Sequence, residues 1–155
     1  MTKKKVLVVD DSAFMRKMIS DIVGQSNHLE VIATARNGED ALRKLPELKP
    51  DVITLDIEMP IMDGIATLQE IMRKHPTPVV MLSSLTKAGA EKTMEAMSNG
   101  AVDSIAKPSG SISLDIEAIS NEIIIKVEAA SLATITRKAE KKKTEIGRIK
   151  PVRAK

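Results

Sequence analysis

The sequence predicts an α/β domain built on a doubly wound, five-stranded parallel sheet with five helices. Two features of the chain indicate this fold class. Short apolar runs alternate strictly with segments whose apolar residues recur at helical spacing. The runs are rich in β-branched residues and contain few polar positions, which is typical of strands covered by helices on both faces. Right-handed crossovers would then place ligands beyond the carboxyl ends of the strands.

The first two predicted strands enclose an amphipathic helix. The run VLVV at residues 6–9 is the first strand, and two carboxylates follow it directly. Apolar side chains recur at helical spacing from Ser12, the predicted N-cap, to about Gln25, and they predict a helix there. The second strand is LEVIATA at residues 29–35.

The middle of the chain contains the third strand between two helices. Asn37 is the predicted N-cap of the next helix, and Pro46 should end or bend it because proline has no N–H to donate. The third strand is DVITLD at residues 51–56. The segment MPIMDG after it contains Pro and Gly, which predicts a loop, and a helix follows at about 65–74.

Two further strands and two helices complete the pattern. PVVMLSS at residues 78–84 is the fourth strand, residues 89–98 the fourth helix and AVDSIA at 101–106 the fifth strand. The last helix is predicted from Leu114 onward. Its apolar stripe consists of Ile116, Ile119, Ile123 and Val127.

Composition limits the chain to one domain and a tail. With 155 residues, of which 43% are hydrophobic, the chain can fill one core of ordinary size. It has no cysteine, so a disulfide framework and a thiolate metal site are excluded. The apolar run at residues 6–9 is too short for a signal peptide or a membrane span. We therefore expect a cytoplasmic protein without membrane insertion.

The basic residues are concentrated at the end of the chain. The net charge is +3, but residues 137–155 alone have nine Lys or Arg against two acids. We expect a folded domain at residues 1–130 and a basic linker or tail at 131–155. The tail could instead contact phosphates of nucleic acid, but it has no aromatic residue and no helix-turn-helix pattern. We therefore expect no nucleic-acid partner.

Charged and hydroxyl side chains lie at the carboxyl ends of four of the five predicted strands. They are Asp10, Asp11, Asp56, Ser83 and Lys107. Parallel strands end at one edge of the sheet, and in the 2-1-3-4-5 order of flavodoxin-like sheets the first and third strands are neighbours. Three carboxylates then lie close together, and their mutual repulsion calls for a cation. Oxygen ligands with room for water and a phosphoryl group suit Mg²⁺.

The predicted magnesium site uses four residues at this edge. Asp11 would bind the ion directly and Asp10 would bind it through water. Asp56 and the backbone carbonyl of Glu58 would complete the set of ligands.

The same residues fit phosphoryl transfer. A carboxylate can act as a nucleophile and form an aspartyl phosphate, and Asp56 stands alone at the end of its strand before an open loop. Ser83 would donate a hydrogen bond to one phosphoryl oxygen, and Lys107 would pair with another.

Four segments of the chain resemble the signature segments of response-regulator receiver domains. They are VLVVDDSAFMR, VITLDIEMPIMDG, VVMLSS and AVDSIAKP, and together they lie between residue 5 and about residue 125. The resemblance implies that Asp56 is the phosphoacceptor beside the acidic pair, with Ser83 as the family's hydroxyl and Lys107 as its lysine. It also implies a cis peptide bond between Lys107 and Pro108.

Within that family, four segments are similar to the regulatory half of the chemotaxis protein-glutamate methylesterase. They are DSAFMRKMI, MPIMDGIATLQEIM, PVVMLSSLT and especially KPSGSISLDI. In such proteins a linker joins the receiver to a Ser-His-Asp esterase that acts on methylated chemoreceptor glutamates and can deamidate glutamines. The resemblance implies that a chemotaxis histidine kinase phosphorylates the receiver and thereby relieves inhibition of the esterase. The effector is missing from this chain, which has no G-x-S-x-G elbow.

Two points depart from the family pattern. Receivers commonly have an aromatic residue three positions before the lysine, where this chain has Ser104, so the switch cannot run through a ring. The histidines are His28 and His75, which we expect in loops without a catalytic role. Whether the chain is itself an enzyme stays open, because alone it would have only phosphoacceptor and autodephosphorylation chemistry.

Two alternatives remain. A dehalogenase-like phosphatase also uses a strand-end aspartate as nucleophile, but its acid two positions later is normally Asp, where this chain has Glu58. The more serious alternative is a stand-alone chemotaxis receiver that acts by docking, for which the tail would have no evident use. An esterase encoded after residue 155 would favour a fragment of a longer regulator over the stand-alone receiver.

Overall fold

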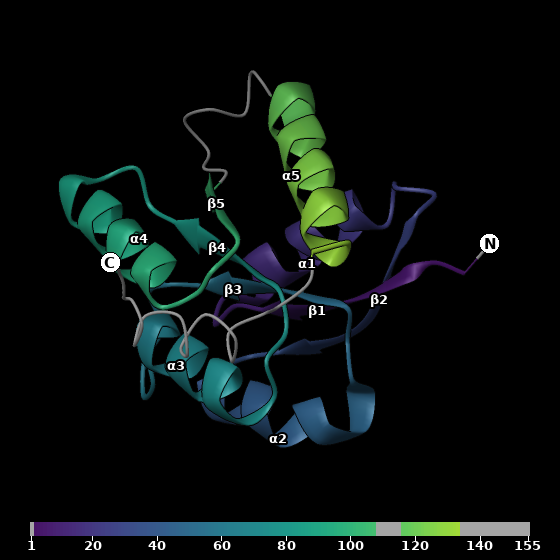
Figure 1. Ribbon diagram of the computed structural model, residues 1–155. Coiled ribbons are helices and arrows are strands. Elements are labelled where there is room, and N and C mark those ends of the chain that lie inside the picture. Colours follow the sequence, from purple (N-terminus) through teal and green to yellow (C-terminus); the bar gives the residue numbers. More distant parts are fainter. Residues whose placement is uncertain (1, 108–115, 134–155) are drawn as a thin grey trace, which may run out of the picture.

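The computed structural model describes residues 2–107 and 116–133, and they form a five-stranded parallel sheet between two layers of helices (Figure 1). The strand order is β2-β1-β3-β4-β5, so the predicted fold class and order are confirmed. The strands are β1 (Lys4–Val9), β2 (Leu29–Ala35), β3 (Val52–Asp56), β4 (Val79–Ser83) and β5 (Asp103–Ala106). The helices are α1 (Ala13–Val23), α2 (Gly38–Leu48), α3 (Gly64–Lys74), α4 (Lys87–Ser98) and α5 (Ile116–Ser131).

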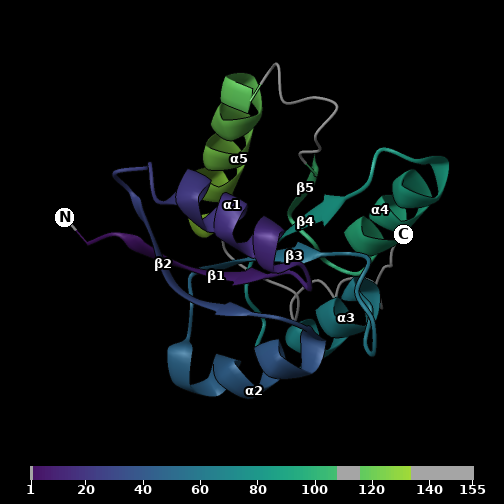
Figure 2. The same ribbon diagram turned by 180° about the vertical axis from the view of Figure 1, so that it is seen from behind.

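Each face of the sheet has its own hydrophobic core. Helices α1 and α5 cover one face, and α2 and α3 lie on the other in both views (Figures 1 and 2). Alternate residues of β1 separate the two cores: Val6 and Val8 pack with α1 and α5, whereas Leu7 and Val9 pack with α2, α3 and α4. All four side chains are buried, which is why the run VLVV is apolar without interruption.

Side-chain caps fix where four helices begin. The capping side chains accept a hydrogen bond from a backbone N–H in the first turn, which leaves one fewer helical N–H unpaired. These caps are Ser12, Asn37, Asp63 and Thr86. Since each cap follows the carboxyl end of a strand, the caps also set the loops at that edge.

One predicted helix start is wrong, and Pro46 does not end its helix, which was one of the two effects predicted for it. Helix α2 continues through Pro46 to Leu48, because in the last turn the missing proline N–H removes a single hydrogen bond. Helix α4 begins at Lys87 and not at Gly89, because Thr86 caps it. In α5, Ile119 is partly buried and both Ile123 and Val127 are buried, as the apolar stripe predicts.

Some predictions fall on residues that the structure does not describe. Pro108 and Leu114 lie outside the described residues, and so does most of the basic tail. The domain boundary between residues 130 and 131 stays a prediction. Among residues 2–107 and 116–133, no helix has the length and hydropathy to cross a bilayer.

Candidate functional site

The register of the sheet brings the predicted site residues to one edge. Val9 pairs with Leu55, so Asp10 and Asp56 follow at the same level of neighbouring strands. Asp56 itself pairs with Leu82, and Ser83 is the next residue of β4. The backbone N–H of Lys107 donates to the carbonyl of Ser83 (2.8 Å), which fixes the start of the loop after β5.

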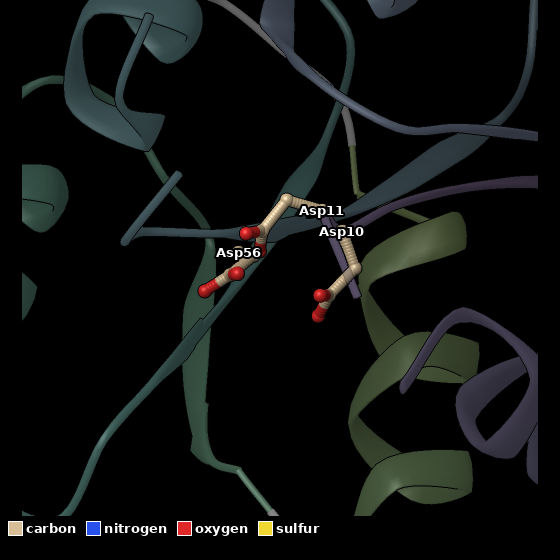
Figure 3. Close-up of side chains that lie close together, drawn as sticks. All are labelled: Asp10, Asp11 and Asp56. Atoms are coloured by element: carbon tan, nitrogen blue, oxygen red, sulfur yellow. The ribbon is translucent and has the colours of Figure 1, made fainter. Parts of the chain in front are cut away.

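Three carboxylates meet at this edge, as Figure 3 shows. Asp10, Asp11 and Asp56 each offer an oxygen within 4.8 Å of the oxygens of the other two. Asp10 and Asp56 are buried, whereas Asp11 is exposed. The structure therefore assembles the acidic cluster that the strand ends predict, with one carboxylate open to solvent.

Lys107 is the cation that lies against this cluster. Its Nζ donates to Oδ1 of Asp56 at 3.1 Å, and the backbone N–H of Glu58 donates to the same oxygen at 3.1 Å. The Asp56 side chain is 0% exposed and the Lys107 side chain 21%. A mostly buried ammonium therefore pairs with the fully buried carboxylate of the phosphoacceptor candidate.

Burial and like charge perturb the carboxyl groups. Burial raises the pKa of Asp56 to about 7, with the Asp10 charge acting in the same direction and Lys107 against it. Burial also raises the pKa of Asp10, although the backbone N–H of Ser12 hydrogen-bonds to it and acts against that rise. For Lys107, burial would lower the pKa, but the charge of Asp56 and its hydrogen bond outweigh burial and raise it.

Among the residues that the structure describes, one oxygen of the site has no hydrogen-bond partner. Oδ2 of Asp56 is buried and accepts no hydrogen bond, although Oδ1 accepts two. A buried carboxylate oxygen without a donor is costly, and a cation beside it removes that cost. One oxygen of Asp56 and the oxygens of Asp10 and Asp11 form a donor set of the kind that Mg²⁺ takes. The residues present therefore fit the predicted ion.

Backbone geometry requires glycine beside Asp56. A Cβ on Gly64 would lie 2.4 Å from the carbonyl oxygen of Asp56, and the Gly64 N–H donates to the carbonyl of Ile57 (2.7 Å). The first turn of α3 thus rests against the end of β3. The Pro- and Gly-containing segment after the third strand predicts a loop, but the sequence alone does not predict this contact.

Two other contacts at the site could not be predicted from the sequence. The guanidinium of Arg16 donates to the backbone carbonyl of Asp10 at 2.8 Å, which joins α1 to the acidic pair. The Glu58 side chain is exposed and accepts a hydrogen bond from Ser84 (3.3 Å). Both contacts depend on how separate elements meet in space, and no local pattern indicates them.

The remaining predicted positions lie away from the acidic cluster. His28 lies in the turn before β2 and His75 follows α3, so both are loop residues as predicted. Ser104 is the second residue of β5, and its backbone carbonyl accepts a hydrogen bond from Lys126 of α5 (2.8 Å).

Several relatives of this chain are named protein-glutamate methylesterase/protein-glutamine glutaminase. A protein-glutamate methylesterase/protein-glutamine glutaminase of Oceanobacillus iheyensis is 62% identical over 135 residues, which are 87% of this chain and 38% of that protein. The protein of the same name from Bacillus subtilis is 56% identical over 129 residues, or 83% of this chain and 36% of its own length. The chain thus spans less than two-fifths of each of these relatives.

Solved structures and a family model identify the family to which the chain belongs. The response regulator domain of Thermotoga maritima CheB superposes with a TM-score of 0.77 at 50% identity, covering 86% of this chain and 99% of that one. The receiver domain of Brucella abortus NtrX gives a TM-score of 0.69 at 30% identity, with 83% and 99% covered. The family model for the response regulator receiver domain matches residues 6–119, and the chain belongs to that family.

Proposed function

We propose that this chain is a phosphoacceptor that takes a phosphoryl group on Asp56 from a phosphohistidine of a chemotaxis histidine kinase. The observation that supports this most directly is the buried carboxylate of Asp56 with one oxygen on Lys107 and the other without a donor. A nucleophile of this kind needs one free oxygen to attack phosphorus. Asp56 is also a member of the acidic cluster.

The bond changes of the transfer are simple. An oxygen of Asp56 forms a bond to phosphorus while the bond between phosphorus and the donor imidazole nitrogen breaks, and that nitrogen keeps the electron pair. Lys107 stabilises negative charge on the phosphoryl oxygens, and Ser83 donates a hydrogen bond to another of them. Attack by water on the same phosphorus later returns Asp56 to its free form.

Four residues would hold the ion during transfer. The side chains of Asp10, Asp11 and Asp56, with the backbone carbonyl of Glu58, provide oxygen ligands of the type that Mg²⁺ prefers. The bound ion would neutralise charge on the transferred group. The close approach of the three carboxylates supports this placement.

The partner controlled by phosphorylation is proposed from the relatives. Those proteins are named as methylesterases and glutaminases, and this chain matches a little over a third of their length. We infer that phosphorylation of Asp56 relieves inhibition of a methylesterase and glutamine deamidase effector that acts on chemoreceptors in the cytoplasm. A receiver that acts by docking alone is the alternative.

Intact-mass analysis tests the phosphoacceptor. The chain is incubated with acetyl phosphate and Mg²⁺, alongside Asp56→Asn and the matched control Asp21→Asn, an exposed aspartate of α1. We expect one phosphoryl adduct in the wild-type chain and in the control, and none in Asp56→Asn or without the metal. An adduct that persists in Asp56→Asn would overturn the proposal.

A fusion tests the effector. The chain is joined to the esterase part of the Bacillus subtilis relative, and methanol released from methylated chemoreceptors is measured with and without acetyl phosphate. A faster release that needs Asp56 supports control of the esterase. Equal release in both conditions favours the docking receiver.

A further inference from the structure

A row of side-chain hydrogen bonds joins the phosphoacceptor loop to the start of α4. Glu58, whose backbone N–H donates to Asp56, accepts a hydrogen bond on its carboxylate from the hydroxyl of Ser84 (3.3 Å). The hydroxyl oxygen of Ser84 lies 3.0 Å from that of Thr86. Thr86 in turn accepts the backbone N–H of Gly89 (2.9 Å) and caps α4.

The direction of these hydrogen bonds follows from the groups involved. Ser84 has one hydroxyl proton, and it is donated to the carboxylate of Glu58, which can only accept. Thr86 must therefore donate its own proton to the oxygen of Ser84 while it accepts the N–H of Gly89. Every donor in the row points from α4 toward Glu58, an arrangement in which each hydrogen bond strengthens the next.

Close packing makes the start of α4 sensitive to this loop. A Cβ on Gly89 would lie 2.5 Å from the carbonyl oxygen of Ser84 and 2.7 Å from its hydroxyl oxygen. Gly89 is buried, so its N–H depends on Thr86 for a partner. A displacement of Ser84 or Thr86 is therefore transmitted to the first turn of the helix.

The usual position of a switch residue offers no equivalent connection. Ser104 has a small side chain, and its backbone carbonyl is occupied by Lys126. A change at Asp56 that affects α4 must therefore be transmitted through other contacts. The row of hydroxyl groups provides one, because it begins one residue after Ser83 and ends on α4.

We propose that Ser84 and Thr86 couple the state of Asp56 to the conformation of α4, in place of an aromatic switch. This inference rests on the proposed phosphorylation of Asp56. A phosphoryl group on Asp56 adds negative charge two residues before Glu58, and the repulsion moves the Glu58 carboxylate away from Ser84. The hydroxyl proton of Ser84 is then free to turn toward the oxygen of Thr86, where it competes with the N–H of Gly89, and the first turn of α4 opens more often.

Hydrogen exchange at the start of α4 tests the coupling. Amide exchange of the peptide containing Lys87 and Gly89 is measured on the full chain before and after treatment with acetyl phosphate and Mg²⁺. Intact mass is recorded on the same samples. In the wild-type chain we expect phosphorylation to speed exchange roughly fivefold, the equilibrium factor of one hydrogen bond of ordinary strength.

Three variants separate the proposed role of the hydroxyl groups from a structural one. Ser84→Ala removes the central hydroxyl while Thr86 still caps the helix, so we expect an adduct without faster exchange. Thr86→Ser keeps the row and should keep the response. Thr93→Val is the matched control, because the Thr93 hydroxyl donates to the carbonyl of Gly89 on the same helix but lies outside the row.

The outcomes distinguish the two proposals. If the wild-type chain forms no adduct, the proposed function fails, and the coupling that rests on it fails with it. If the adduct forms but exchange at α4 is unchanged or slower, the coupling is overturned and the phosphoacceptor stands. A response of wild-type size in Ser84→Ala overturns the coupling as well.

Discussion

Lys107 and Asp56 are 51 residues apart in the chain, yet the Lys107 ammonium lies 3.1 Å from a carboxylate oxygen of Asp56. The contact brings together the residue after β5 and the last residue of β3, with β4 between these two strands. A buried carboxylate with one cation against it and two acids nearby is electrostatically strained. The strain predicts how stability and metal binding depend on Asp56 and its neighbours.

Asp56→Asn is expected to stabilise the fold at high pH. The folded-state pKa of Asp56, about 7, lies above the ordinary value of 3.8. Between these values the folded state keeps a proton that the unfolded chain has released, so the free energy of unfolding falls as pH rises toward 7. We expect the advantage of Asp56→Asn over wild type, measured by urea unfolding without Mg²⁺, to grow by about 2–3 kcal/mol from pH 5 to pH 8.

Asp40→Asn is the control for this pH dependence. Burial would raise the pKa of Asp40, but the backbone N–H of Arg36 and the side chains of Lys44 and Arg43 outweigh it and lower the pKa. Asp40 is then ionised at both pH values, and its loss should cost about 1–2 kcal/mol at each. An advantage of Asp56→Asn that does not change with pH would contradict the raised pKa.

Mg²⁺ is expected to stabilise the wild-type chain through the acidic cluster. At about ten times its Kd, a ligand that binds only the folded state adds about 1.4 kcal/mol, which raises the Tm of a domain of this size by roughly 4 °C. Asp11→Asn should abolish the rise in Tm, because Asp11 is the carboxylate of the cluster that we expect to bind the ion directly. The Tm is measured by differential scanning calorimetry with and without MgCl₂.

Asp21→Asn is the matched control for the metal. Asp21 is an exposed carboxylate of α1 paired with Lys17, away from the cluster, so its variant should respond to Mg²⁺ as the wild type does. An equal rise of Tm in Asp11→Asn would show that the ion acts elsewhere on the protein.

Gly64→Ala is expected to destabilise the fold by about 3 kcal/mol, because the added Cβ would lie 2.4 Å from the carbonyl oxygen of Asp56. Either α3 or the end of β3 must move, and the acidic cluster moves with β3. Gly24→Ala is the comparison, since a Cβ at Gly24 would lie 3.2 Å from the carbonyl oxygen of Ser20. Urea unfolding should show a much smaller loss for Gly24→Ala, and equal losses would count against the close contact at Gly64.

The central strands could be predicted from the sequence because they are buried on both faces. In β1, β3 and β4 nearly every side chain contacts one core or the other, so the runs are continuously apolar and easy to locate. Once the strands are placed, their carboxyl ends lie at one edge by geometry alone. The positions of Asp10, Asp56 and Lys107 at the site therefore follow from the chain.

The contacts that the sequence did not indicate depend on small differences at helix ends. Helix α4 is predicted to begin at Gly89, but the hydroxyl of Thr86, three residues before Gly89, caps the helix and starts it at Lys87. Pro46 lies in the last turn of α2, where its missing N–H costs little. The contact between Glu58 and Ser84 joins two loops, and no spacing in the sequence predicts it.

Lys107→Met is expected to slow phosphorylation of Asp56 by acetyl phosphate roughly 10²-fold, the usual effect of losing one donor to a developing negative charge. The ammonium is positioned before the reaction, since it already donates to Oδ1 of Asp56 from a side chain that is only 21% exposed. Its loss removes charge stabilisation from the transferred group and also raises the pKa of Asp56 further, so fewer molecules have an ionised nucleophile. The rate of adduct formation is followed by intact mass over pH 6 to 9, and the deficit of the variant should be larger at the lower pH.

Lys126→Met is the matched control, because Lys126 is similarly half-buried, at 31% exposed, but donates to Ser104 of β5. A wild-type rate in Lys107→Met would mean that this ion pair holds Asp56 in place without acting on the phosphoryl group.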